Sequence, residues 1–309
     1  MAMGPRRCIA LLGAFLAAVL VSCGDDDEGS DRARPAGDPV KLVQETLKPN
    51  PAARSGRIDG RIEIALKGVP RFAEPFSVGV SGPFRYRSGA SLPDYELEMG
   101  VRDNGVGLTS LRGRSWVSLG STGYTLPGKV RRRLVRHAVR GENGLTRTLL
   151  QFGIRPWRWE TDRRIAGRTR IDGVEVVHIT TGFTAGHILQ DANTLLGLLS
   201  SLRLTRATGL PDLISRRARQ IVVRSVTLKK GEQWIGAKDK VMRRAGFTMR
   251  FAIPKADRTM LGGISAGTVV GELHVTDVGR PQRIGAPATT GSFADFQAGI
   301  DAVGDAQDR

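Results

Sequence analysis

Polar and apolar residues alternate without a break in Tyr95-Glu96-Leu97-Glu98-Met99-Gly100-Val101-Arg102. The turn sequence Asp103-Asn104-Gly105 follows, and the apolar residues resume in Val106-Gly107-Leu108. An alternation of period two predicts a strand with one buried and one exposed face, and Asn-Gly is a signal for a tight hairpin turn. This stretch therefore predicts an antiparallel hairpin, and it decides the fold class.

Similar strand patterns occur on both sides of the hairpin. Residues 61–66 and 76–80 precede it, and Ser115-Trp116-Val117-Ser118-Leu119 follows it after Gly113. A second set of predicted strands covers residues 165–182 with a turn at Asp172-Gly173, and then 223–228, 233–236, 241–253 and 268–278. Consecutive strands separated by Gly or Asn-Gly breaks are typical of an antiparallel meander.

Helical periodicity interrupts the strands in two places. Residues 127–153 predict two helices, the second over 145–152, and residues 187–204 form a long helix with one wide apolar face. A shorter helix is expected after Pro211. Strands and helices thus come in blocks and do not alternate one by one, which predicts an α+β fold with one antiparallel sheet and helices gathered on one face.

The N-terminus predicts where the protein works. A basic start is followed by the apolar stretch 8–21, which ends in Leu20-Val21-Ser22-Cys23 and resembles a bacterial lipobox. We expect a signal peptide over 1–22, an acylated Cys23, and an extracytoplasmic position at the outer face of the cell membrane. The alternatives are an ordinary secretory signal or a buried apolar helix. Arg6-Arg7 suggests twin-arginine export, but Cys8-Ile9-Ala10 fits that pattern poorly, so general secretion is favoured.

Composition argues against catalysis. The chain has two Cys, Cys8 and Cys23, so the body beyond them has no disulfide framework, thiolate nucleophile or Cys-based metal site. Four His residues occur, at 137, 178, 187 and 274, and none has metal-ligand spacing. The segment 263–267 matches Gly-x-Ser-x-Gly, but a loop is expected before it and a strand after it, whereas a nucleophile elbow needs a strand and then a helix. We therefore expect no enzyme, no metal and no cofactor.

Charge is divided unevenly. The chain carries +17 overall; the signal contributes +2 and residues 23–39 contribute −4, which leaves +19 from Val40 onward. A basic body predicts an anionic partner, and an exported chain meets lipid headgroups or wall polymers sooner than nucleic acid. The alternative is solubility combined with Arg-rich codon usage. The candidates for contact with an anionic headgroup or membrane surface lie at helical spacing on one face: Lys129, Arg132, Arg133, Arg136 and Arg140. The alternative is that this face is simply solvated.

Several short segments of the sequence resemble those of a known family. These are Trp116-Val117-Ser118-Leu119 with Tyr124-Thr125-Leu126-Pro127, then the segments 172–180 and 234–244, and finally Pro281-Gln282-Arg283-Ile284-Gly285-Ala286-Pro287. In this order, and together with the lipobox, they resemble the actinobacterial LppX/LprAFG lipoproteins, which are related in fold to the lipoprotein carrier LolA. This chain departs from that family in its strong basicity and in the Arg-rich sequence 129–147.

The resemblance implies a curved half-barrel of antiparallel strands whose concave face is covered by helices around an apolar cavity for acyl chains. It implies a division into the signal 1–22, an acidic tether 23–51, the lipid-binding domain 52–290 and a C-terminal tail 291–309. No ligand contact of the family transfers to a residue here. The inward-facing apolar sets predict the cavity lining as Ile62, Ile64, Leu66, Leu97, Met99, Val101, Ile188, Leu195, Leu199, Phe247, Met249 and Phe251.

Together these features predict a membrane-anchored lipoprotein that carries or presents an acyl lipid or glycolipid in the cell envelope. The alternative is an envelope scaffold or regulatory lipoprotein whose basic surface holds an anionic polymer, lipid or protein. The sequence names no protein partner.

Overall fold

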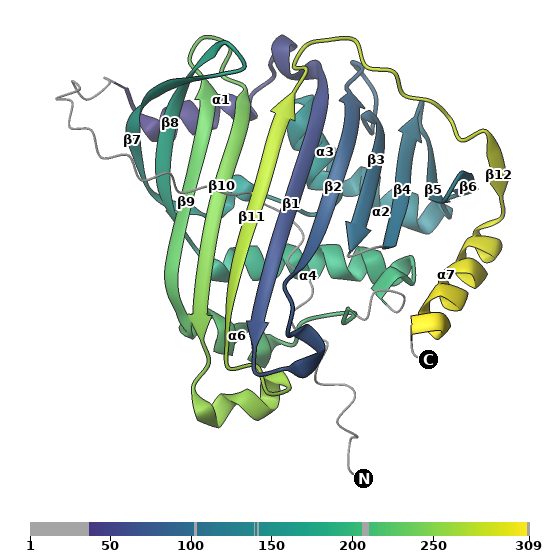
Figure 1. Ribbon diagram of the computed structural model, residues 1–309. Coiled ribbons are helices and arrows are strands. Elements are labelled where there is room, and N and C mark those ends of the chain that lie inside the picture. The colour runs from purple at the N-terminus through teal and green to yellow at the C-terminus, as the bar shows by residue number, and fades with distance from the viewer. Residues whose placement is uncertain (1–36, 102–103, 139, 141, 206–209, 308–309) are drawn as a thin grey trace.

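The computed structural model describes residues 37–101, 104–138, 140, 142–205 and 210–307. Their strands form one open sheet in the order β12-β6-β5-β4-β3-β2-β1-β11-β10-β9-β8-β7 (Figure 1). The first meander consists of β1 (Ser55–Lys67), β2 (Phe76–Arg85), β3 (Asp94–Val101), β4 (Asn104–Leu111), β5 (Arg114–Leu119) and β6 (Thr122–Thr125). The second consists of β7 (Glu160–Ile171), β8 (Val174–Phe183), β9 (Val226–Gly236), β10 (Met242–Ala252) and β11 (Ala266–Thr276). The two meanders join where β1 pairs antiparallel with β11.

The hairpin that the sequence predicts is β3–β4. Its register pairs Leu97 with Leu108 and ends at Val101 opposite Asn104. Leu97 and Leu108 are both buried, as their period-two positions predict. The alternation holds equally in β1, where Ile58 and Ile62 are buried while Arg61 is exposed.

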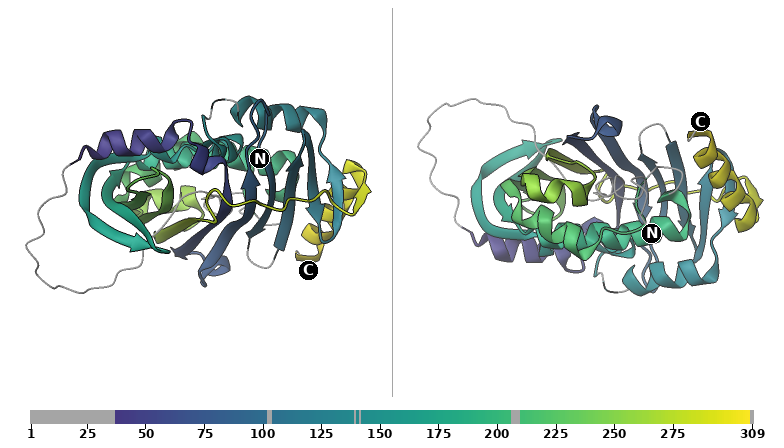
Figure 2. Two further views of the ribbon diagram at one scale, coloured as in Figure 1. Left: turned by 90° about the horizontal axis from the view of Figure 1, so that it is seen from above. Right: turned by 90° about the horizontal axis from the view of Figure 1, so that it is seen from below.

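The helices gather on one face of the sheet. Helices α2 (Gly128–Ala138) and α3 (Gly144–Gln151) connect β6 to β7, and α4 (Ala185–Ser201) and α6 (Arg216–Arg224) lie between β8 and β9. Figure 1 shows α2, α3 and α4 behind the strands, and Figure 2 shows the bend of the sheet at its β7–β8 end. Short 3₁₀ turns are η2 (Pro51–Arg54), η3 (Pro70–Phe72), η4 (Pro156–Arg158) and η5 (Lys255–Leu261). The α+β fold with a curved, open sheet is confirmed.

Helix α1 (Pro39–Leu47) differs from the flexible tether expected up to residue 51. Asp38 caps it, because the carboxylate accepts hydrogen bonds from the backbone N–H groups of Val40 and Lys41. Leu42 and Val43 are buried in a small apolar cluster with three residues of β8 and β9, namely Val177, Ile179 and Ile235. The helix is nine residues long with two buried side chains, too few to show a clear period in the sequence.

The C-terminus is also more ordered than the loose tail expected after residue 290. Strand β12 (Thr289–Gly291) pairs in parallel with β6, and α7 (Phe293–Gln307) follows it. Phe296 is fully buried, with its ring 5.6 Å from that of Tyr124. The final strand and helix therefore cover the β6 edge of the sheet.

The boundary between α6 and β9 differs from the sequence prediction. Val223 was expected in a strand, but α6 extends to Arg224 and β9 begins at Val226.

The signal segment and Cys23 lie outside the described residues. Within the described part of the chain, no helix combines the length and the apolar character that crossing a membrane requires.

Candidate lipid-binding cleft

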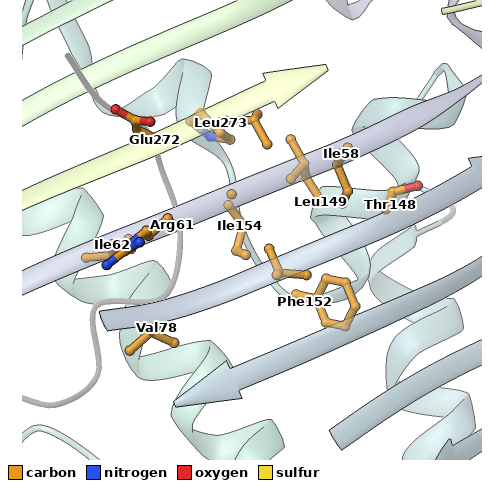
Figure 3. A pocket seen from close by; sticks show the side chains of 13 residues that line it. Ile58, Arg61, Ile62, Val78, Thr148, Leu149, Phe152, Ile154, Glu272 and Leu273 are labelled. Atoms are coloured by element: carbon orange, nitrogen blue, oxygen red, sulfur yellow. The ribbon is translucent and has the colours of Figure 1, made fainter. Parts of the chain in front are cut away.

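A first cavity of about 50 Å³ lies between the centre of the sheet and α3. Strands β1, β2 and β11 form one wall, and α3 with the residues that follow it forms the other. Figure 3 shows the side chains around it. Its apolar lining consists of Ile58, Ile62, Val78, Val80, Leu149, Phe152, Ile154, Pro156 and Leu273. The cavity is therefore an apolar space between the two layers of the fold.

A second cavity of about 40 Å³ adjoins the first, since Pro156 and Leu273 line both. Its apolar wall includes Phe183, Ile188 and Phe247. Its lining also contains polar residues, among them Glu160, Thr181 and Gln233. We call the two adjoining cavities the cleft; it is apolar at the α3 end and mixed at the β7 end.

The cleft is too small to hold an acyl chain as it stands. An apolar cavity of about 150 Å³ accommodates a benzene molecule. Each cavity here is about a third of that size. An acyl chain thus requires the helical layer to move away from the sheet.

The residues predicted to line a cavity are buried wherever the structure describes the side chain, and they have different roles. Ile62 lines the first cavity, and Ile188 and Phe247 line the second. The structure places most of the others in the packed core around the cleft: Ile64, Leu66, Leu97, Met99, Leu195, Leu199, Met249 and Phe251. Val101 ends β3, and its side chain is outside the described ones.

Sequence reasoning missed the wall that α3 and its following residues supply. Residues 145–152 were expected to form a helix, but Leu149, Phe152 and Ile154 were not expected to face a cavity. Ile154 and Pro156 lie outside regular helix and strand, where periodicity assigns no buried face. The sequence carried no signal for them beyond their apolar character.

A buried carboxylate fixes this wall to α4. Asp191 accepts hydrogen bonds from the backbone N–H of Arg155 at 2.7 Å and from its guanidinium Nη2 at 2.6 Å. The indole Nε1 of Trp159 donates to the same carboxylate at 3.0 Å. A buried charge needs such partners, because an uncompensated one is strongly destabilising. Trp159 is therefore a core residue, whereas Trp157 is partly exposed.

Glu160 is the acidic group at the β7 end of the cleft. Burial raises the pKa of its carboxyl group, while Arg163 and Gln233 oppose that rise by donating hydrogen bonds. The Arg163 Nε–Oε2 distance is 2.7 Å. A ligand that enters the second cavity therefore meets a hydrogen-bond acceptor held in place by two donors.

The basic face of α2 divides into two parts. Lys129, Arg132 and Arg136 are exposed on the helix, and Arg140, which the sequence predicts on the same helix, is exposed in the turn beyond its end at Ala138. Arg133 is half-buried and donates to the carbonyl oxygens of Gly197, at 2.9 Å, and Thr194 of α4. Arg133 thus joins the two helices. Nearby, burial and the neighbouring arginines lower the pKa of His137.

The described residues contain no group of three or more His, Cys, Asp or Glu side chains that could hold a metal ion. The Gly-x-Ser-x-Gly segment lies between η5 and β11, so it has a 3₁₀ turn before it and a strand after it. This context is the opposite of the strand-to-helix turn that a nucleophile elbow requires.

No protein-family model and no curated protein sequence matches the chain. Among solved structures it is similar to LprF from Mycobacterium bovis, at 12% identity and a TM-score of 0.39, over 83% of this chain and 100% of that one. The lipoprotein LppX from Mycobacterium tuberculosis matches at 12% identity and 0.37, over 80% and 97%. A LolA superfamily protein from Nitrosomonas europaea matches at 9% and 0.19, over 78% and 95%. The resemblance found in the sequence is to lipoproteins of the same LppX/LprF type. Structural similarity at such low identity and TM-score assigns neither a ligand nor a role to any residue.

Proposed function

We propose that this chain is a lipoprotein, anchored through acylated Cys23 to the outer face of the cell membrane, that binds an acyl lipid or glycolipid between its sheet and its helices. It would carry or present that lipid within the cell envelope without catalysis. The supporting observation is the pair of adjoining cavities between the layers, the first apolar and the second mixed, which meet at Pro156 and Leu273.

The energetics of transfer suit a small cleft that opens. Sixteen methylenes gain about 13 kcal/mol on leaving water, at about 0.8 kcal/mol each. A membrane offers the same gain, so transfer between membrane and protein is close to balanced. The free energy of moving helices from the sheet is then the main cost of loading, and the protein lowers the barrier of exposing the lipid to water.

Helix α3 is the part of the cleft wall that we expect to move, because Asp191 fixes only the residues that follow it, 155–159, to α4. Helix α3 has eight residues, against seventeen in α4. Leu149 of α3 lines the first cavity and is only partly buried. A substitution at Leu149 therefore changes the cleft with little effect on the packing of the core.

Filling the first cavity tests the proposal. The full chain is purified from its own membrane, and native mass spectrometry with lipid extraction measures bound acyl lipid. Leu149→Trp should lower the bound lipid several-fold, because the indole occupies the cavity, whereas Leu149→Met conserves volume and should retain it. Trp at Leu195 or Leu199 is a poorer test, since both are buried in the core and overpacking destabilises it. Unchanged loading in Leu149→Trp, or no acyl lipid in the unaltered chain, would contradict the proposal.

A second candidate function is an envelope scaffold that holds an anionic polymer. The exposed cations of α2 favour it, since none of Lys129, Arg132, Arg136 and Arg140 forms an ion pair among the described residues. Arg132→Gln with Arg136→Gln should then weaken binding to a soluble polyanion and leave lipid loading unchanged. Binding of the polyanion equal to that of the unaltered chain would exclude this face.

A further inference from the structure

The end of the molecule that carries α6 concentrates exposed apolar side chains. Four large apolar residues are exposed among those described, and three of them lie in the segment 213–228. Leu213 precedes α6 and is 59% exposed; Val223 is on α6, and Leu228 is the third residue of β9. The fourth, Val40, is on α1. Single exposed apolar residues are ordinary on a protein surface, but three in sixteen positions are concentrated at one end.

The same segment is strongly basic. Residues 213–230 contain six Arg and Lys and no Asp or Glu. Arg224 pairs with Asp257 at 2.6 Å, and Lys230 pairs with Glu232 at 2.9 Å. Arg216 and Arg217 are exposed, and neither forms an ion pair among the described residues. Their charge is thus available to an external anion.

We propose that the α6 end, defined as residues 213–230, docks the body onto the anionic surface of a lipid bilayer. Apolar side chains set among cations fit a bilayer interface, where the cations contact phosphate headgroups and the apolar groups enter the acyl boundary. A soluble polyanion accounts for the arginines but not for Leu213, Val223 and Leu228. Among the described residues, the α2 face differs from this pattern, because no exposed large apolar residue lies beside its cations.

The geometry of the chain permits this orientation. Helix α1 packs near the β7–β8 hairpin, at the opposite end of the sheet from α6 (Figure 1). The sixteen residues from Cys23 to Asp38 span at most about 50 Å when extended. Strand β9, which runs from α6 toward the other end, has eleven residues, or about 36 Å. An anchored Cys23 therefore allows the α6 end to face the same membrane.

The docking surface also adjoins the cleft. Val223 lies beside Gly186 in the first turn of α4, and Ile188 of that turn lines the second cavity. The proposal goes beyond lipid binding, because it concerns where the body meets the membrane, and it stands even if the cleft takes no acyl chain.

Labels on single cysteines test the orientation. In the full chain with Cys8→Ser and Cys23→Ser, the sequence has no other Cys, so one engineered thiol carries an environment-sensitive fluorophore. The label is placed by Leu213→Cys, Val223→Cys or Leu228→Cys, with Val40→Cys as the matched exposed apolar control. The apolar segment 8–21 still attaches the chain to vesicles, so the comparison is between positions within one bound chain.

On vesicles of phosphatidylcholine with phosphatidylglycerol, the three α6-end labels should shift to the blue and be quenched by brominated acyl chains, and the Val40 label should not. Phosphatidylcholine alone, or high salt, should reduce the response. Arg216→Gln with Arg217→Gln should lower the ratio of docked to undocked body about 25-fold, since each cation near an anionic surface contributes about fivefold. Arg170→Gln with Lys238→Gln removes the same charge from exposed residues at the opposite end and should leave it unchanged.

Three outcomes would overturn the proposal. They are α6-end labels that stay as solvated as the Val40 label, docking that survives loss of Arg216 and Arg217, and an equal response to soluble polyphosphate without lipid. Failure of lipid loading in Leu149→Trp or in the unaltered chain tests the cleft alone, so the two proposals fail separately.

Discussion

The indole Nε1 of Trp159 donates a hydrogen bond of 3.0 Å to the Asp191 carboxylate, and both side chains are buried. Because Arg155 donates to the same carboxylate, one acid of α4 fixes both ends of the segment 155–159. Ile154 and Pro156 of the cleft wall lie in or next to that segment. The position of the wall thus depends on Asp191, which lines neither cavity.

Asp191→Ala should lower the free energy of unfolding by about 3 kcal/mol, because it leaves buried donors without their acceptor. Urea denaturation measures the loss, and hydrogen exchange should show faster exchange in residues 153–159. Glu175→Ala is the matched control, since its ion pair with Arg168 is exposed on both sides and contributes less than about 1 kcal/mol. Equal losses in the two variants would contradict this role of Asp191.

Arg133→Met should lower the free energy of unfolding by about 1–2 kcal/mol, because two carbonyl oxygens of α4 lose a charged donor while the side-chain stem remains. The exposed neighbour Arg132 supplies the control, and Arg132→Met should stay within about 0.5 kcal/mol of the unaltered chain. Thermal and urea unfolding of the two variants decide whether Arg133 joins the helices.

Acid should destabilise the fold through Asp94, which is 1% exposed. Burial alone would raise the pKa of its carboxyl group, but hydrogen bonds from Arg87, the backbone N–H of Arg112 and Arg85 outweigh it and hold the pKa below its ordinary value. A lowered carboxyl pKa stabilises the folded state above the unfolded pKa of about 3.9, and that contribution is lost as the pH falls through the folded value.

Urea midpoints measured from neutral pH down to acid should therefore fall further below about pH 4. Asp94→Asn should be less stable at neutral pH and should show a smaller fall in that window. His137 and His178, whose pKa values are lowered chiefly by burial, act in a separate window below about pH 6.5. An unchanged acid slope in Asp94→Asn would rule out this assignment.

Phe296→Ala should detach the C-terminal helix from the sheet. The ring is fully buried against Tyr124, and its removal should cost about 3 kcal/mol. Hydrogen exchange should speed up in β12 and α7 and stay slow in the central strands. The partly exposed Phe293 provides a control, because Phe293→Ala should have a smaller effect.

The sequence predicts the strands and the main helices well, because alternation in residues 95–102 and the apolar stripe of 187–204 are local signals of burial. It misses α7, although Phe293, Phe296, Ile300 and Val303 have helical spacing, because Ala, Gly and Asp occupy most of the positions between them. The sequence also does not show that Arg133 and Arg132 have different roles. Arg133 reaches the α4 backbone at Gly197, where a Cβ atom would lie 3.1 Å from its guanidinium, so a glycine on a distant helix decides its role.

The lining of the cleft is harder still to predict from the sequence. Most of the predicted lining residues are buried where the pattern places them, but which of them border a gap depends on how closely α3 approaches β1 and β2. That distance depends on Asp191, Arg155 and Trp159, which are separated along the chain and carry no shared pattern.

The pairing of β1 with β11 has a consequence for biogenesis. Within each meander the paired strands follow one another in strand order, whereas the β1–β11 junction joins Arg57 to Thr276. During synthesis the N-terminal meander emerges first, and one edge of β1 then stays unpaired until almost the whole chain has been made. An unpaired edge is a template for intermolecular association. The exposed residues that alternate along β1 are charged, namely Arg57, Asp59, Arg61 and Glu63. They oppose such association, so they protect the newly made chain as well as covering the finished sheet.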